Sequence, residues 1–133
     1  MQEASIVLMV SGGGMTYLAL RKVLDEAGVQ VHLAGSCAEA EKILKALKIP
    51  AVLFSDTALP DGTWLDVLSL ATQARRRVPV IVVSRVVDIN LYISALEYGA
   101  SDFIVPPFYR QDISHVLMCA TQKGAVMPRL AAA

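Results

Sequence analysis

The chain has 133 residues, the length of a single domain, and its hydrophobic fraction of 55% excludes an intrinsically disordered protein. Twelve Lys and Arg balance twelve Asp and Glu, so the formal net charge is zero, which argues against direct nucleic-acid binding through a cationic surface. Every apolar run is far shorter than the roughly 20 residues of a membrane span. We therefore expect one cytoplasmic domain over residues 1–123, without membrane contact, and a tail or the start of a linker over residues 124–133.

Five apolar runs alternate with five segments of helical spacing. The runs occupy residues 6–10, 29–34, 51–54, 80–83 and 103–105. Most are rich in β-branched residues and continuously apolar, which is typical of strands covered on both faces. This order predicts an α/β fold, a (βα)₅ open, doubly wound parallel sheet, since a barrel of this type needs eight strands.

The helical segments carry apolar residues at positions i, i+3, i+4 and i+7. Gly28 and Gly99 are expected to end the first and fourth helices, Ser36 and Glu39 to form a capping box on the second, and Asp88 to cap the fourth. The residues expected to face the sheet are Leu20, Val23, Leu24 and Ala27; Ala40, Ile43, Leu44 and Leu47; Leu65 and Leu68; Ile89, Tyr92, Ile93 and Leu96; and Ile113, Val116, Leu117 and Ala120.

The remaining reactive or charged residues show no pattern of a site. Cys37 and Cys119 have no metal-binding spacing and are predicted to be small buried hydrophobic residues. His32 and His115 are isolated and are expected at the surface or half-buried. Residues 75–77, three consecutive arginines, are expected to complement the dipole at the end of the third helix as a solvated face.

In a doubly wound sheet the working crevice lies at the carboxyl ends of the strands. Residues 11–14, 56–62, 84–87 and 106–108 directly follow four of the predicted strands. Any functional site is therefore expected among these four segments.

One string among them is specific: residues 52–62 form a buried strand, with Asp56 at its tip, followed by Leu-Pro-Asp-Gly. This string resembles the phosphoacceptor region of response-regulator receiver domains, and the resemblance extends over residues 5–120. Ser84 stands where receivers place a Ser or Thr, Phe103 at their aromatic switch position, and residues 107–108 match the end of their Lys-Pro-Phe motif. The resemblance implies a flavodoxin-like sheet of order 2-1-3-4-5 and a signalling module, not an enzyme, of a bacterial two-component or phosphorelay system.

The departures from the family pattern concern its charged residues. Receivers place two acidic residues where this chain has Ser11 and Gly12, and a Lys where it has Pro106. Asp56 and the carbonyl of Ala58 alone would be a poor Mg²⁺ site, and no amine is left to neutralise a phosphoryl group. We therefore predict an atypical receiver that holds no cofactor and has weak or absent Mg²⁺-dependent phosphorylation.

If phosphorylation occurs, the resemblance makes Asp56 the phosphoacceptor, Ser84 the phosphoryl contact and Phe103 the switch aromatic. Each residue also has a structural interpretation. Asp56 would cap its strand by accepting backbone N–H bonds, Ser84 would be a turn hydroxyl, and Phe103 would pack in the core.

The resemblance also implies partners: a histidine kinase or phosphotransfer protein, an output domain, or a second copy. In receivers these contacts use the face made by the fourth helix, fifth strand and fifth helix. The matching residues, called the interaction surface below, are Val86, Val87, Leu91, Tyr92, Ala95, Tyr98 and Tyr109.

One alternative stays open. The glycine-rich loop from Ser11 to Thr16 could bind a nucleotide or another anion through its backbone N–H groups, as flavodoxin-like folds do with flavin mononucleotide. The loop lacks both G-x-x-x-x-G-K-[ST] and G-x-G-x-x-G, so it also fits a tight turn between strand and helix.

Overall fold

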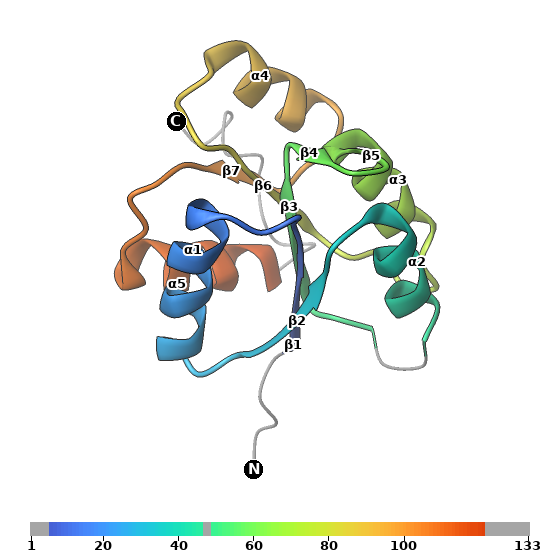
Figure 1. Ribbon diagram of the computed structural model, residues 1–133, viewed down its shortest axis with the longest axis horizontal. Coiled ribbons are helices and arrows are strands. Elements are labelled where there is room, and N and C mark those ends of the chain that lie inside the picture. Colours follow the sequence, from blue (N-terminus) through green and yellow to red (C-terminus); the bar gives the residue numbers. More distant parts are fainter. Residues whose placement is uncertain (1–5, 47–48, 122–133) are drawn as a thin grey trace.

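The computed structural model describes residues 6–46 and 49–121, so the predicted tail over residues 124–133 lies outside the described part. In chain order the elements are β1 (Ile6–Val10), α1 (Met15–Glu26), β2 (Gln30–Ala34), α2 (Cys37–Lys45), β3 (Val52–Asp56), β4 (Ala58–Leu59), β5 (Gly62–Thr63), α3 (Trp64–Gln73), β6 (Val80–Val83), α4 (Ile89–Glu97), β7 (Asp102–Ile104) and α5 (Arg110–Thr121). Figure 1 shows a central sheet with α1 and α5 on one side and α2 and α3 on the other.

The sheet confirms the predicted topology. Its order is β2-β1-β3-β6-β7 and every pairing is parallel, which is the order 2-1-3-4-5 when only the strands of this sheet are counted. The β4–β5 hairpin, which follows Asp56 directly, is antiparallel and was not predicted. Two-residue strands of this kind are too short to produce a periodic pattern in the sequence.

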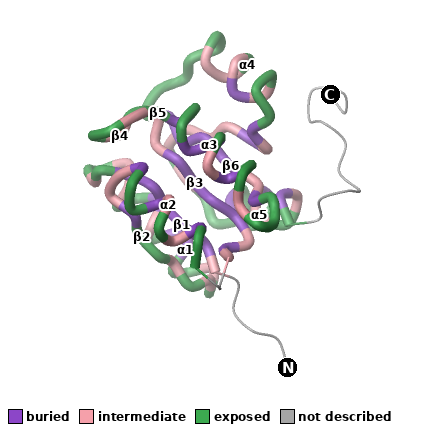
Figure 2. Tube along the Cα trace, turned by 90° about the vertical axis from the view of Figure 1, so that its right-hand side faces the viewer, coloured by how far each residue is buried: buried purple, intermediate pink, exposed green. Residues whose placement is uncertain are grey.

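Alternate residues of the central strands enter two separate cores. On β1, Val7 and Met9 pack with α1 and α5, whereas Leu8 and Val10 pack with α2, α3 and α4. Figure 2 shows β1, β3 and β6 buried over most of their length. The edge strand β2 is less buried, and Leu33 on it is 45% exposed. The reason is that helices cover only part of the surface of an edge strand.

The helix ends follow the predicted signals with one difference. Gly28 and Gly99 have φ of +83° and +107°, the left-handed conformation that stops a helix, and Asp88 accepts the N–H of Leu91. On α2, Ser36 accepts the N–H of Glu39, but the Glu39 carboxylate accepts the N–H of Gly35 instead of completing the box at Ser36. A reciprocal capping box joins Thr63 and Asp66 at the start of α3, and it was not predicted.

Two predicted helix faces are wrong in part, although Leu68 on α3 is buried as predicted. On α3 the buried stripe contains Trp64, not Leu65, which is 42% exposed. On α4, Ile89 and Ile93 are 63% and 40% exposed, and the fully buried residue is Ala95. The fourth helix is apolar nearly all round, so periodicity alone could not select the face that contacts the sheet. The predicted core position Leu47 lies outside the described residues.

For the cysteines, histidines and arginines that were predicted to have no role at a site, the observed burial differs in part from the prediction. Cys37 is buried as predicted, but Cys119 is only half-buried. His32, His115 and residues 75–77 are exposed, and the three arginines follow the last residue of α3. Among the described helices, none combines the length and the apolar character needed to cross a membrane.

Burial raises the pKa of the Cys37 thiol to about 11, and Asp61 and Asp66 add to the effect. At pH 8 we expect Cys37 to react with iodoacetamide about 100-fold more slowly than an exposed thiol of ordinary pKa, because the thiolate is the reacting form. Mass spectrometry over a time course measures this rate. The Cys119→Ser variant, whose single thiol is Cys37, should show only the slow reaction; fast labelling there would contradict the assignment.

Candidate functional site

Parallel pairing of β1 with β3 places Ser11 next to Asp56. Val10 lies opposite Ser55 in the register, so the residues that follow them share the carboxyl edge of the sheet. The Ser11 hydroxyl donates a hydrogen bond to Asp56 Oδ2 over 3.1 Å and accepts one from the Gly13 N–H over 3.0 Å. Ser11 is only 6% exposed, so water competes little for this contact. The hydroxyl thus holds the carboxylate against the β1–α1 loop.

A shallow pocket opens beside this pair. Its walls are mostly apolar, and Asp56 is the one carboxylate among the residues that line it. The lining residues are Met9, Val10, Ser11, Thr16, Tyr17, Leu20, Phe54, Asp56 and Val83. The pocket therefore carries one formal negative charge and no positive one.

The β1–α1 loop is a tight turn. Gly13 and Gly14 have φ of +107° and +105°, which side chains adopt only with strain, whereas Gly12 has ordinary backbone and no atom within 4 Å of an added Cβ. One of the loop donors, the Gly13 N–H, is already bonded to Ser11. Gly13 and Gly14 therefore have a structural role in the turn.

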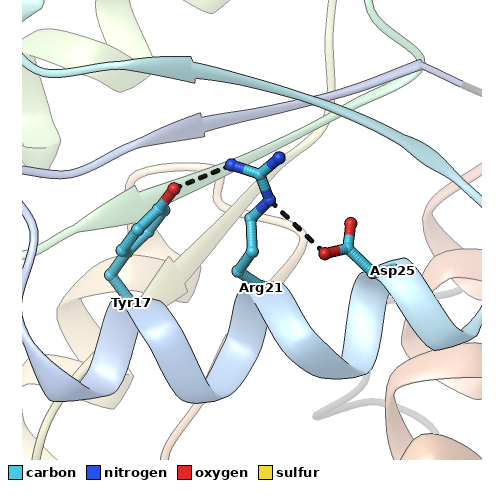
Figure 3. Close-up of polar contacts among 3 residues, drawn as sticks. All are labelled: Tyr17, Arg21 and Asp25. Carbon is cyan, nitrogen blue, oxygen red and sulfur yellow. Dashed lines mark hydrogen bonds and ion pairs between the residues drawn. The ribbon is translucent and has the colours of Figure 1, made fainter.

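Arg21, on α1, is held by two side chains of the same helix, and one of them, Tyr17, lines the pocket (Figure 3). Arg21 donates to the Tyr17 hydroxyl over 2.9 Å and lies 3.6 Å from the Asp25 carboxylate. The hydrogen bond to Tyr17, with Asp25 as a smaller contribution, raises the pKa of Arg21, which stays charged. The ion pairs Arg21–Asp25 and Lys45–Glu41 both lie within single helices, and neither involves Asp56.

Ser84 and Phe103 do not contact Asp56 through a hydrogen bond. The Ser84 hydroxyl donates to the Val86 carbonyl over 2.8 Å, so it closes the turn between β6 and α4. The Phe103 ring packs against the core and meets Tyr92 edge-on at a centroid distance of 5.7 Å. In this structure Ser84 is a turn hydroxyl, and Phe103 is a half-buried ring covered by α4.

Asp61 has a role that was not predicted. Its two carboxylate oxygens accept the N–H groups of Cys37, over 2.7 Å, and Ala38, over 3.0 Å. These are the first two residues of α2, whose N–H groups have no partner within the helix. The two bonds lower the pKa of Asp61 and fasten the loop after Asp56 to α2. A contact across 23 residues leaves no periodic signal in the sequence.

The Asp61 contact predicts a pH dependence of stability. A lowered folded-state pKa means that the carboxylate stabilises the fold above its ordinary pKa of about 3.9, and that this contribution disappears as the pH falls through the lower folded value. We expect Asp61→Asn to lower the melting temperature at pH 6, and the difference from the native chain to shrink as the pH falls below the ordinary carboxyl pKa of about 3.9. Thermal melts across this range measure it, with Glu26→Gln on the exposed face of α1 as the control. A difference that is constant with pH would contradict the assignment.

Two aromatic contacts join the site to α4. Trp64 follows the Asp56 loop, where its N–H donates to the Thr57 carbonyl, and its ring meets Tyr98 edge-on at 6.2 Å. Phe103 and Tyr92 make the second contact. A change in the Asp56 loop can therefore reach α4 through direct packing.

The interaction surface is only partly at the surface. Four members are exposed: Val86 (66%), Val87 (73%), Tyr98 (65%) and Tyr109 (60%). Leu91 and Tyr92 are half-buried, and Ala95 is fully buried against the core, so including Ala95 was wrong. The helix turns Ala95 toward the sheet because its small side chain allows close packing there.

A metal site is not apparent in the part of the chain that the structure describes. No group of three or more His, Cys, Asp or Glu side chains is placed to hold an ion. Position 106, where receivers carry a Lys, is a proline joined to Pro107 by a cis peptide bond. The donors at the carboxyl edge are the Asp56 carboxylate, hydroxyls and backbone groups.

Comparisons with known proteins agree with this fold and site. The chain is 28% identical over 109 residues to the photosynthetic apparatus regulatory protein RegA of Cereibacter sphaeroides, which covers 82% of this chain and 57% of RegA. It is 30% identical over 126 residues to the transcriptional regulatory protein KdpE of Mycobacterium tuberculosis, covering 95% of this chain and 55% of KdpE. The chain thus spans little more than half the length of these two relatives.

Solved structures show the same fold. A receiver domain from Clostridium thermocellum superposes with a TM-score of 0.77 at 21% identity, covering 90% of this chain and 95% of that one. The receiver domain of the sensor histidine kinase PA1611 from Pseudomonas aeruginosa was solved with a coordinated magnesium ion. It superposes with a TM-score of 0.77 at 18% identity, covering 91% of this chain and 100% of that one.

The family model of the response regulator receiver domain matches residues 7–118. Those residues include the sheet apart from Ile6, the Ser11–Asp56 pair and most of α5. The alternative nucleotide-binding function of loop 11–16 is not favoured by any of these matches. The chain belongs to the response regulator receiver domain family and is a receiver domain of two-component signalling.

Proposed function

We propose that this receiver domain signals through protein–protein recognition and that Mg²⁺-dependent phosphoryl transfer at Asp56 is weak or absent. Receiver domains are signalling modules that interact with histidine kinases and output domains of two-component systems. The observation that carries the proposal is the hydrogen bond from the Ser11 hydroxyl to Asp56, at the position where receivers carry an acidic residue.

Charge decides the chemistry at this site. Forming an acyl phosphate adds negative charge beside the carboxylate, and only nearby cations can stabilise it. Mg²⁺ requires oxygen ligands in octahedral geometry and is usually held by carboxylates. The pocket offers the carboxylate of Asp56 alone, so the donor set does not fit Mg²⁺.

The other two components of phosphoryl transfer are also displaced or missing. The Ser84 hydroxyl is bonded to its own turn, and Pro106 has no amine to reach a phosphoryl oxygen. The neutral Ser11 hydroxyl instead stabilises the free carboxylate. These contacts support a structural role for Asp56 as the group that fixes the β1–α1 loop.

The proposed recognition uses the exposed part of the interaction surface. Val86 and Val87 precede α4, Tyr98 ends it and Tyr109 precedes α5, and all four are at least 60% exposed. Exposed apolar and aromatic side chains of this kind are enriched in protein interfaces. We propose that this surface binds a second copy, an output domain or a cytoplasmic histidine kinase or phosphotransfer protein.

Sedimentation velocity tests the proposal on the purified chain. We expect a concentration-dependent dimer that Val87→Asp abolishes, since a charge at the centre of an apolar contact must be desolvated. Asp56→Asn should leave the dimer unchanged, and so should Leu18→Asp, which places a charge on the exposed face of α1. A dimer that forms only with acetyl phosphate and Mg²⁺ and is lost in Asp56→Asn would contradict it.

A further inference from the structure

Helix α5 carries a pair of metal-binding side chains that the signalling site does not use. His115 and Cys119 lie one turn apart, with Nε2 of the imidazole 3.5 Å from Sγ of the thiol. His115 is exposed and Cys119 half-exposed, so an ion in solvent can reach both. Two ligands at i and i+4 share one helix face, which is the spacing that helical zinc sites use, so the prediction that His115 is isolated was wrong.

The distance between the two atoms suits one metal in particular. Zinc binds imidazole nitrogen at about 2.0–2.1 Å and thiolate sulfur at about 2.3 Å in tetrahedral geometry, which places the two ligand atoms about 3.6 Å apart. The observed separation of 3.5 Å is close to that value, although it also fits a hydrogen bond between the thiol and the imidazole. The two side chains are therefore near enough to bind one ion together.

The other half has to come from outside the chain. Within the described residues no third His, Cys, Asp or Glu completes a cluster with this pair. A two-fold axis beside α5 would bring His115 and Cys119 of a second copy to the same ion and give two nitrogen and two sulfur ligands. Met118, next to Cys119 in the sequence, is 50% exposed and would add apolar contact across such an interface.

We propose that His115 and Cys119 form a half-site for Zn²⁺ that joins two copies of this chain through α5. The pair shares no residue with the Asp56 pocket or with the interaction surface, so it does not rest on the proposed signalling function. It would make the association of this chain depend on the zinc supply. Binding releases the Cys119 proton and leaves the neutral imidazole as ligand, with no oxidation or reduction.

Sedimentation velocity of the full chain, reduced with a phosphine and titrated with Zn²⁺, tests the proposal in the Val87→Asp background. That background removes any association through α4. We expect a dimer with one Zn²⁺ per two chains, reversed by a chelator. Cys119→Ser and His115→Ala should each weaken Zn²⁺ binding by at least about 10-fold, the cost of losing even an outer-sphere partner. His32→Ala, an exposed histidine on β2, is the matched control and should bind as before.

Replacing Zn²⁺ with Co²⁺ identifies the ligands. The expected spectrum contains thiolate-to-cobalt charge transfer and intense tetrahedral d–d bands, both lost in Cys119→Ser. The proposal would be overturned by a chain that stays monomeric with Zn²⁺, by a complex of one ion per chain, or by a dimer that persists with the chelator or in Cys119→Ser. A dimer that disappears on reduction alone would be a disulfide and would also overturn it.

Discussion

Installing the missing charges should create Mg²⁺-dependent binding of beryllofluoride, an acyl-phosphate mimic, in the variant Gly12→Asp/Pro106→Lys. Gly12 has ordinary backbone and no atom within 4 Å of an added Cβ, so a carboxylate can be added there, one residue after Ser11, without a clash. Together the two carboxylates supply Mg²⁺ ligands, and the new ammonium neutralises the mimic. At 100 times the dissociation constant, binding would stabilise the fold by about 2.7 kcal/mol, which thermal melts with and without Mg²⁺ measure.

Two controls separate this effect from nonspecific binding. Adding Asp56→Asn to the double variant should abolish the stabilisation, because the mimic attaches to that carboxylate. Gly13→Asp in place of Gly12→Asp should fail, since Gly13 has φ of +107° and a side chain there is strained. Stabilisation of the native chain equal to that of the double variant would show that the added charges are not needed.

Gly62→Ala should lower the free energy of unfolding by about 2 kcal/mol. A Cβ at Gly62 would lie 2.5 Å from Asp66 Oδ2 and 3.0 Å from the buried Cys37 Sγ. The Asp66 carboxylate would have to give up its hydrogen bond from the N–H of Thr63, and losing this helix cap costs about 1 kcal/mol. Crowding of the Cys37 side chain adds a similar cost. Urea denaturation measures the change.

Gly12→Ala is the matched control for Gly62→Ala. It changes a glycine in open space with ordinary backbone, so its effect should stay within about 0.5 kcal/mol. Equal losses in the two variants would mean that the loss of glycine flexibility, and not the contacts at Gly62, sets the cost.

The sequence predicted the sheet because its signal is strong and repetitive. Buried parallel strands such as β1 and β6 are continuously apolar, and their bounds agree with the prediction. Placing Ser11 and Asp56 at one edge followed from the topology alone. Their hydrogen bond did not, because it depends on the side-chain rotamer and on the turn through Gly13.

Long-range polar contacts and the orientation of α4 could not be predicted from the sequence. Asp61 caps a helix that begins 24 residues earlier, and only the three-dimensional fold brings the two together. Ala95 was assigned to the surface by resemblance, whereas packing on the sheet selects the smallest residue of the helix for the closest approach. Tertiary packing decided both cases.

Trp64 offers the most direct test of the claim that Asp56 lacks its phosphoryl-transfer partners. Its ring is 6% exposed, begins α3 directly after the Asp56 loop and contacts Tyr98. Tryptophan fluorescence of the native chain, titrated with beryllofluoride in the presence of Mg²⁺, should change no more than that of Asp56→Asn. A saturable, Mg²⁺-dependent change in the native chain that disappears in Asp56→Asn would show that the single carboxylate suffices.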